Sequence, residues 1–356
     1  FDARGRALWT SSTGNPGPSV PAVVDGVVYE GSGGGSQDGR LLAFDAQAAS
    51  SNCTGTGTKI CAPLWSATLA PAPFAVTSSP AVSNGVVYVG SQDGDLYALD
   101  AAGRVHCSGI PKLCAPLWHA VIGGQVLSSP AVANGVVYIG STYRDGGDGL
   151  FAFDAAGKVN CGGTPTVCRP LWSAPTRGNV NATPAVANGV VYVGSDDGNL
   201  YAFDARGQQQ CSGTPVVCSP MWRFPLLGTN VYTAAAVAYG TVYMASSSGE
   251  LFALDAAGTR NCSGTPKICR PLWSAAVSPG LPLSSPSVAD GVVYISSLDG
   301  HVYGFDARGR ADCTGSPVSC APVWSATGGL TPVISNGNVY VGTLNGLIYA
   351  YGHPSR

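Results

Sequence analysis

The sequence carries little charge: Lys, Arg, Asp and Glu make up 11% of its 356 residues, and the formal net charge is −2. Such a chain offers no basic field to nucleic acid or to an anionic lipid surface. No apolar run approaches the roughly 20 residues that a membrane-spanning helix requires. No window long enough for a helix shows an apolar period of 3.6 residues. We therefore expect no nucleic-acid partner, no membrane insertion and no helical fold.

What the sequence does contain is one repeating unit. Its Trp residues recur at intervals of 50 to 56 residues, at Trp9, Trp65, Trp118, Trp172, Trp222, Trp273 and Trp324. Short runs rich in Val and Tyr lie between successive Trp residues, and their length and composition are typical of strands. Pairs such as Asn134-Gly135 join the first run to the second and accept the positive φ of a tight hairpin. A period of this size indicates a solenoid or a propeller.

The repeat predicts an all-β fold, a seven-bladed β-propeller of four-stranded antiparallel blades in a single domain, residues 1–356. The expected blades are residues 19–67, 78–120, 128–174, 182–224, 233–275, 284–326 and 330–352. The chain begins on a Trp strand, residues 7–10, and ends on a third strand. We therefore expect residues 1–10 to supply the outer strand of the last blade, which closes the ring and removes open sheet edges.

Twelve cysteines fall into six local pairs, and we expect each pair to form a disulfide. The pairs are Cys53-Cys61, Cys107-Cys114, Cys161-Cys168, Cys211-Cys218, Cys262-Cys269 and Cys313-Cys320. Zinc sites prefer ligands two to four residues apart, and the four His residues do not cluster. Disulfides indicate an oxidising location: extracellular, at the cell surface or periplasmic.

The repeat resembles that of pyrroloquinoline-quinone (PQQ) dehydrogenase-type β-propellers and their cofactor-free relatives. The resemblance rests on the pattern SSPAVxNGVVYVGS, on residues 96–100, and on Asp-x-x-Gly followed by Trp, as in Asp2, Gly5 and Trp9. It covers essentially the whole chain. It implies that each Trp packs between neighbouring blades and that the Asp fixes a turn, so that both are structural residues. The chain is identified as a cofactor-free member.

The chain departs from the family pattern in six of seven repeats. From Gly103 to Trp118 the step is fifteen residues, whereas from Gly5 to Trp9 it is four. The insertion carries the Cys pair and lies in the connection between the third and fourth strands. A disulfide closing about eight residues removes on the order of 2–3 kcal/mol of unfolded-chain entropy. The gap between the termini lacks the pair, because no covalent loop exists there.

The loops expected around the central channel lack carboxylates. They are residues 11–18, 68–77, 121–127, 175–181, 225–232, 276–283 and 327–330, and their one charged residue is Arg177. A quinone dehydrogenase needs a carboxylate base and acidic or amide ligands for Ca²⁺. The family's enzymes also have a disulfide between adjacent cysteines, which this sequence lacks. We expect no catalytic residue, no metal and no cofactor, with a PQQ- and Ca²⁺-dependent oxidoreductase as the enzymatic alternative.

Three features are candidate binding sites. Glu30 is a carboxylate where the other repeats have Val, Ile or Met, so either the first blade is open there or Glu30 has a partner. An aromatic, amide and guanidinium rim could hold a sugar or a peptide, and it comprises Tyr143, Arg144, Asp145, Asp148, Arg177, Asn179, Asn181, Asn230 and Tyr232. The acidic turns at Asp145, Asp148, Asp196 and Asp197 could take Ca²⁺. His106 and His119 are expected to be structural residues of the outer edge.

These features favour a non-catalytic secreted or cell-surface propeller that acts as a binding scaffold or sensor module, with a protein or glycan as its ligand. A carbohydrate-binding propeller and a self-assembling surface or filament protein are the alternatives, and the oligomeric state stays open. The segment Phe1–Gly5 repeats Phe305–Gly309. We therefore expect further sequence to precede Phe1.

Overall fold

The computed structural model describes residues 7–14, 19–142, 149–226, 231, 233–277, 284–343 and 345–352. The regular secondary structure of these residues is β-strand throughout, and they contain no helix that could cross a membrane. Backbone contacts divide the chain into two compact units, Phe1–Pro175 with Thr214–Val216, and Thr176–Gly213 with Val217–Arg356. The all-β prediction is thus confirmed for the described part of the chain.

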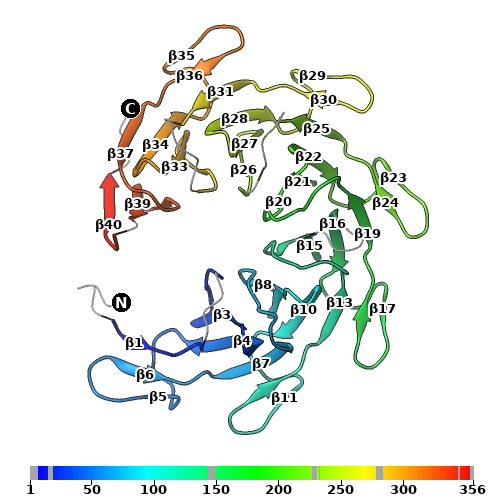
Figure 1. The fold of residues 1–356 in the computed structure, drawn as a ribbon, viewed down its shortest axis with the longest axis vertical. Helices are drawn as coiled ribbons and strands as arrows, with labels where there is room; N and C mark the ends of the chain where they lie inside the picture. The colour runs from blue at the N-terminus through cyan, green and yellow to red at the C-terminus, as the bar shows by residue number, and fades with distance from the viewer. Residues whose placement is uncertain are drawn as a thin grey trace. The chain divides into compact units, whose positions relative to one another are not determined.

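The first unit contains three sheets that each hold one sequence repeat (Figure 1). They are formed by β2 (Ala22–Val24), β3 (Val27–Gly34), β4 (Gln37–Asp45) and β7 (Trp65–Ala70); by β8 (Ala81–Ser83), β9 (Val86–Gly90), β10 (Asp95–Asp100) and β13 (Trp118–Val121); and by β14 (Ala131–Ala133), β15 (Val136–Ser141), β16 (Gly149–Asp154) and β19 (Trp172–Pro175). Its cysteine hairpins are β5 (Cys53–Thr54) with β6 (Lys59–Cys61), β11 (Cys107–Ser108) with β12 (Leu113–Cys114), and β17 (Cys161–Gly162) with β18 (Val167–Cys168). The N-terminal strand is β1 (Trp9–Thr10).

The second unit repeats this plan. Its sheets are formed by β20 (Ala185–Ala187), β21 (Val190–Ser195), β22 (Asn199–Asp204) and β25 (Trp222–Pro225); by β26 (Ala236–Ala238), β27 (Thr241–Ala245), β28 (Glu250–Asp255) and β31 (Trp273–Ala276); by β32 (Ser287–Ala289), β33 (Val292–Ser296), β34 (His301–Asp306) and β37 (Trp324–Thr327); and by β38 (Val333–Ser335), β39 (Asn338–Gly342) and β40 (Ile348–Gly352). Its hairpins are β23 (Cys211–Ser212) with β24 (Val217–Cys218), β29 (Cys262–Ser263) with β30 (Ile268–Cys269), and β35 (Cys313–Thr314) with β36 (Ser319–Cys320).

The turn chemistry explains the first hairpin of each sheet. Asn84 and Gly85 both have positive φ, 50° and 76°, and connect Ser83 to its ladder partner Val86. Asn and Gly tolerate this conformation, whose twist matches that of the paired strands. Tyr239, which stands where the other repeats have Asn or Asp, adopts the same geometry with φ of 53°. The tertiary fold therefore imposes the turn even on an unfavourable residue.

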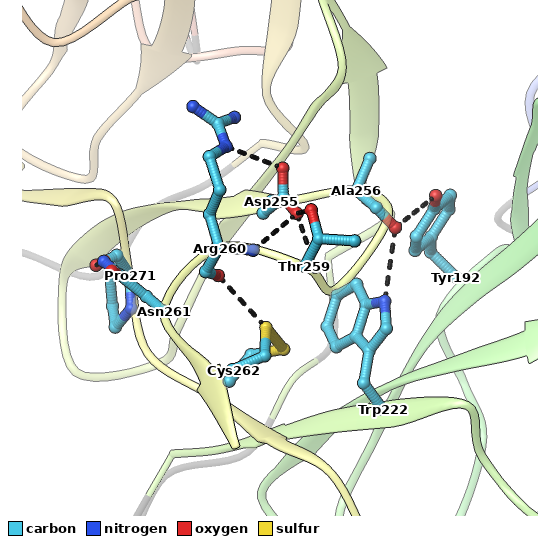
Figure 2. A network of polar contacts seen from close by, with 10 residues as sticks. Tyr192, Trp222, Asp255, Ala256, Thr259, Arg260, Asn261, Cys262 and Pro271 are labelled. Atoms are coloured by element: carbon cyan, nitrogen blue, oxygen red, sulfur yellow. Dashed lines mark hydrogen bonds and ion pairs between the residues drawn. A yellow bond between two sulfur atoms is a disulfide. The ribbon is translucent and has the colours of Figure 1, made fainter.

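Two aromatic donors join several of the sheets to the sheet that follows. Tyr192 Oη and Trp222 Nε1 donate hydrogen bonds to the same carbonyl oxygen, that of Ala256, at 3.0 and 3.2 Å (Figure 2). The same contact recurs for Tyr29 and Trp65 with Ala101, Tyr88 and Trp118 with Ala155, and Tyr243 and Trp273 with Ala307. Because these side chains are buried, each satisfied donor avoids a desolvation cost.

The Asp-x-x-Gly motif presents that carbonyl. Asp255 Oδ2 accepts the backbone N–H groups of Thr259 and Arg260 at 2.7 and 3.0 Å, which fixes the turn (Figure 2). Burial acts to raise the pKa of Asp255, but these hydrogen bonds and those from the two side chains outweigh it and lower the pKa to about 2. Gly258, with φ of +63°, lies against the Trp222 ring. The motif is therefore a docking turn for the Trp of the preceding repeat.

The six disulfides form as the sequence predicts. We call each cysteine hairpin a strap, because it does more than close a loop. The strap strand β12 pairs in parallel with β7 of the preceding sheet, with Leu113 opposite Ser66. The same register recurs for β13 with β18, β25 with β30, and β31 with β36. The sheets that a strap extends in this way have six strands, where the sequence predicts four.

Serine side chains of the Ser-Ser-Pro segments link the inner strands through hydrogen bonds. Ser78 Oγ accepts the N–H of Gly90 within its own repeat, at 2.7 Å. Ser79 Oγ accepts the N–H of Val20 from the preceding repeat, at 2.9 Å, and the Ser79 N–H reaches Ser129 Oγ at the same distance. The first strands β2, β8 and β14 consequently lie side by side within the first unit.

We predict that Gly258→Ala destabilises the protein through its contact with Trp222. A Cβ at position 258 would lie 2.2 Å from Trp222 Cδ1, whereas a Cβ at Gly240, which also has positive φ, would meet nothing within 4 Å. Gly240→Ala should therefore cost only the backbone strain, about 1–2 kcal/mol, and Gly258→Ala roughly 1–3 kcal/mol more. Denaturant unfolding measures both variants, and equal losses would contradict the docking role of Gly258.

Candidate functional site

The predicted rim is only partly described. Tyr143, Arg144, Asp145, Asp148, Asn230 and Tyr232 lie outside the described residues. Its remaining members gather around Asp196, whose Oδ2 accepts Nδ2–H groups from Asn179 and Asn181 at 3.1 and 3.0 Å. Burial raises the pKa of Asp196 despite these two hydrogen bonds. The Arg177 N–H donates to Asp197 Oδ2 at 3.2 Å, so the described part of the rim is hydrogen-bonded within itself.

Two oxygen atoms of this group lack donors. Asp196 Oδ1 and Asn181 Oδ1 are buried and have no hydrogen-bond partner. Within the described ranges, no three His, Cys, Asp or Glu side chains lie close enough to hold a metal ion. The calcium hypothesis therefore stays a prediction for Asp196 and Asp197.

Glu30 lies on β3 opposite Leu42 of β4 and is half-buried. Burial raises the pKa of its carboxyl group. Tyr29, its neighbour, faces Trp65 and the second sheet, so alternation along the strand turns Glu30 toward the other face. In the second, third, fifth and sixth repeats the residue at this position packs against the preceding sheet and is apolar: Val89, Ile139, Met244 and Ile295.

The two histidines of the outer edge differ in role. His106 Nδ1 lies 3.0 Å from the carbonyl oxygen of Pro116, as the amides of Asn160 and Asn261 do from Pro170 and Pro271. It is thus a structural residue at the base of a strap. His119 instead lines a pocket of 240 Å³ in the first unit.

Residues of three strands and one strap form the His119 pocket. Asp95 and Tyr97 come from β10, and His119 from its neighbour β13. The remaining walls include Leu69 of β7, Pro116, and the tip of a strap at Pro165 and Thr166. The strap lies over His119 because the His119 N–H donates to the Thr166 carbonyl at 3.1 Å.

A short polar network crosses this pocket. His119 Nδ1 lies 2.9 Å from Asp95 Oδ2, and the His119 ring stacks on Tyr97 with centroids 6.0 Å apart. Tyr97 Oη lies 2.6 Å from Asp93 Oδ2 and 2.9 Å from the Leu69 carbonyl oxygen. One hydroxyl hydrogen thus faces two acceptors.

The surroundings of this network raise the pKa of both Asp95 and Tyr97. Burial raises the pKa of Asp95, and the hydrogen bond from His119 only partly offsets it. Burial, followed by the hydrogen bond to Asp93, raises the pKa of Tyr97. The pocket is therefore rich in acceptors and poor in positive charge.

Sequence reasoning missed this pocket, although a signal was present. The residue after the Trp is Ser66, Ser173, Ser274 and Ser325 in four other repeats, and Arg223 in a fifth. His119 is thus a departure at a position that faces the third strand. Its partner Asp95 begins that strand, where the third, fourth and fifth repeats have Gly149, Asn199 and Glu250.

A larger open groove of 1530 Å³ runs beside the first sheet. Asp38 supplies a carboxylate to its wall, and Arg40 and Lys112 supply cations. Asp38 Oδ1 accepts the Ala72 N–H at 2.9 Å, so this carboxylate fixes a loop.

The chain shares its repeat with a known protein family. A family model of PQQ-like repeats, described as "Outer membrane protein assembly factor BamB", matches residues 1–111, 62–160, 165–261 and 218–312. The chain belongs to this family. A search of curated proteins finds no match.

Two solved structures are similar to this chain. BamB from Moraxella catarrhalis is 17% identical, with 97% of this chain and 86% of that chain covered and a TM-score of 0.58. The computationally designed Ika8 protein is 13% identical, with 98% and 100% covered and a TM-score of 0.59. At these identities the likeness shows the fold, a propeller of PQQ-like repeats.

All twelve cysteines of this PQQ-like propeller are in disulfides whose partners are seven or eight residues apart, so no adjacent-cysteine disulfide exists. The polar group at Asp196 has one carboxylate whose Oδ2 accepts hydrogen bonds from two amides. A second carboxylate, Asp197, accepts hydrogen bonds from the Arg177 N–H and the Tyr201 hydroxyl. The expectation of no quinone cofactor therefore stays a prediction.

We predict that Asp95→Asn stabilises the protein at neutral pH. A carboxyl whose pKa rises on folding costs stability once the pH exceeds its unfolded value of 3.8. Asn cannot ionise, yet its Oδ1 still accepts the His119 Nδ1–H. Thermal unfolding should show a gain of roughly 0.5–2 kcal/mol at pH 7 that disappears at pH 3.5, with the exposed Glu250→Gln as control. A loss at pH 7 would show that the contact with His119 outweighs the effect of burial.

Proposed function

We propose that this propeller is a non-catalytic binding scaffold whose straps receive a protein partner. The observation that carries the proposal is an exposed apolar side chain just before the second cysteine in each of five straps: Ile60, Leu113, Val167, Val217 and Ile268. Ile110 at a strap tip is also fully exposed. Exposed apolar groups in recurring positions are typical of interaction surfaces.

The straps suit this role because they are rigid. Each is closed by a disulfide, and four of them have a strand that pairs with the preceding sheet. A partner that binds such hairpins does not pay to order them. The family's name refers to an assembly factor, which favours protein–protein interaction over catalysis. The disulfides favour an oxidising location, which we propose is the periplasm, the cell surface or the extracellular space.

We predict that Ile110→Asp with Leu113→Asp abolishes partner binding without loss of stability. Affinity capture from the envelope and secreted fractions of the source organism, followed by mass spectrometry, measures binding. Val23→Asp changes an equally exposed residue on an inner strand and should leave capture intact. Capture that survives the strap variant, or oxidation of alcohols or sugars on addition of PQQ and Ca²⁺, would overturn the proposal.

We further propose that the seven repeats close into a ring, with β1 as the outer strand of the last sheet. Trp9 Nε1 donates to the Ala46 carbonyl at 3.0 Å. Thr10 lies opposite Ile60 in the strap, and β7, β13, β25 and β31 pair in the same way with the strap of the repeat that follows. The sheet of β38, β39 and β40 has three strands among its described residues. Tyr340 is the counterpart of the tyrosines that join a Trp at the shared carbonyl, and closure would bring its hydroxyl to Ala46.

Closure predicts a large effect at an exposed position. Ile348 is 79% exposed on the last sheet, whereas its counterparts Leu96, Leu150, Leu200 and Leu251 are fully buried. If the ring closes, Ile348→Asp lowers the free energy of unfolding by about 2–5 kcal/mol, while Ile60→Asp on a strap changes it by less than about 0.5 kcal/mol. Equal, small effects would argue for an open chain of repeats. Light scattering that showed concentration-dependent multimers would favour head-to-tail assembly through this face.

A further inference from the structure

We propose that the His119 pocket binds a single basic side chain, Lys or Arg, of the protein partner. This inference rests on the proposed binding function and assigns the chemistry of one contact. The pocket measures 240 Å³, below the roughly 300–1,000 Å³ of sites for drug-sized ligands. Its size therefore suits one side chain better than a cofactor or an oligosaccharide.

The pocket has more acceptors than donors. Asp95 lines it, Asp93 lies behind Tyr97, and the Leu69 carbonyl also faces the Tyr97 hydroxyl. His119 is the one cationisable group on the described wall, and its Nδ1 is already directed at Asp95. Acceptors in a partly desolvated site favour a ligand that brings N–H donors and positive charge.

The chain contains its own template for such a ligand. In the fourth repeat, Tyr201 Oη lies 2.6 Å from Asp197 Oδ2, the same distance as Tyr97 from Asp93. There Arg223 replaces His119, and its Nη1 donates to Asn199 Oδ1 at 2.8 Å. Arg223 and Arg177 both act electrostatically on Tyr201.

The second repeat thus keeps the Asp–Tyr pair, adds the carboxylate Asp95, and lacks the guanidinium that accompanies the pair in the fourth. A guanidinium or ammonium group from outside would restore the same arrangement. Tyr97 and Trp118 also line the site. The rings of Tyr and Trp attract cations that lie within about 6 Å of a ring centroid.

The test is a titration of the intact protein with two blocked tripeptides, Gly-Arg-Gly and its neutral citrulline analogue, followed by the His119 ring signals in NMR spectra. We expect the arginine peptide to bind with a dissociation constant in the millimolar range and citrulline to bind at least about tenfold more weakly. Asp95→Asn should weaken arginine binding by a similar factor, and Glu250→Gln, at the equivalent position of the fifth repeat, should leave it unchanged. Thermal unfolding verifies that both variants fold.

Three outcomes would overturn the inference. Equal binding of the two peptides would show that charge is not recognised, and unchanged binding by Asp95→Asn would place the site elsewhere. Binding of Ca²⁺ alone, without binding of arginine, would make the pocket a metal site. If a partner is captured through the straps and its affinity does not respond to Asp95→Asn, the scaffold function stands and only this contact is removed. If arginine binds but no partner is captured, the contact stands and the scaffold function is removed.

Discussion

The structure depends on a backbone carbonyl shared by two aromatic donors. Trp and Tyr each carry a polar hydrogen that must be satisfied once the ring is buried. The carbonyl of Ala256 serves both Trp222 and Tyr192, and its counterparts serve the corresponding pairs. Because donors and acceptor lie in different repeats, neither repeat can satisfy its own aromatics. The sheets are therefore stable only when they pack beside their neighbours, as is typical of repeat proteins.

This constraint explains which residues of the repeat stay fixed. The Asp orders the turn, as Asp255 does through its hydrogen bonds to the backbone, and the Gly leaves room for the ring, as Gly258 does for Trp222. The strap adds a second, independent link, since its parallel strand pairs with the residue after the Trp. The aromatic contact and the strap together hold both sides of the Trp strand, and this explains how a chain with so little charge and such short strands keeps its sheets in register.

Much of this could be predicted from the sequence, because it is local or repeated. The Asn84-Gly85 turn follows from backbone preference, and the disulfides follow from pairs a few residues apart. The parallel pairing of β12 with β7 could not be predicted, since it joins an insertion to the previous repeat and no local pattern encodes that register. Loop composition predicts the rim, but it does not show that the side-chain amides of Asn179 and Asn181 donate hydrogen bonds to Asp196.

The His119 pocket shows where a repeat protein departs from its own average. A residue that is identical in all repeats serves the scaffold, because every interface needs it. His119 differs from its counterparts, which are Ser, Arg or Thr, and it contacts Asp95 across adjacent strands. The scaffold does not need a histidine at this position, since four other repeats have Ser there. Burial raises the pKa of Asp95, so we expect its ionised carboxylate to reduce stability at neutral pH. Residues that cost stability are typical of binding sites.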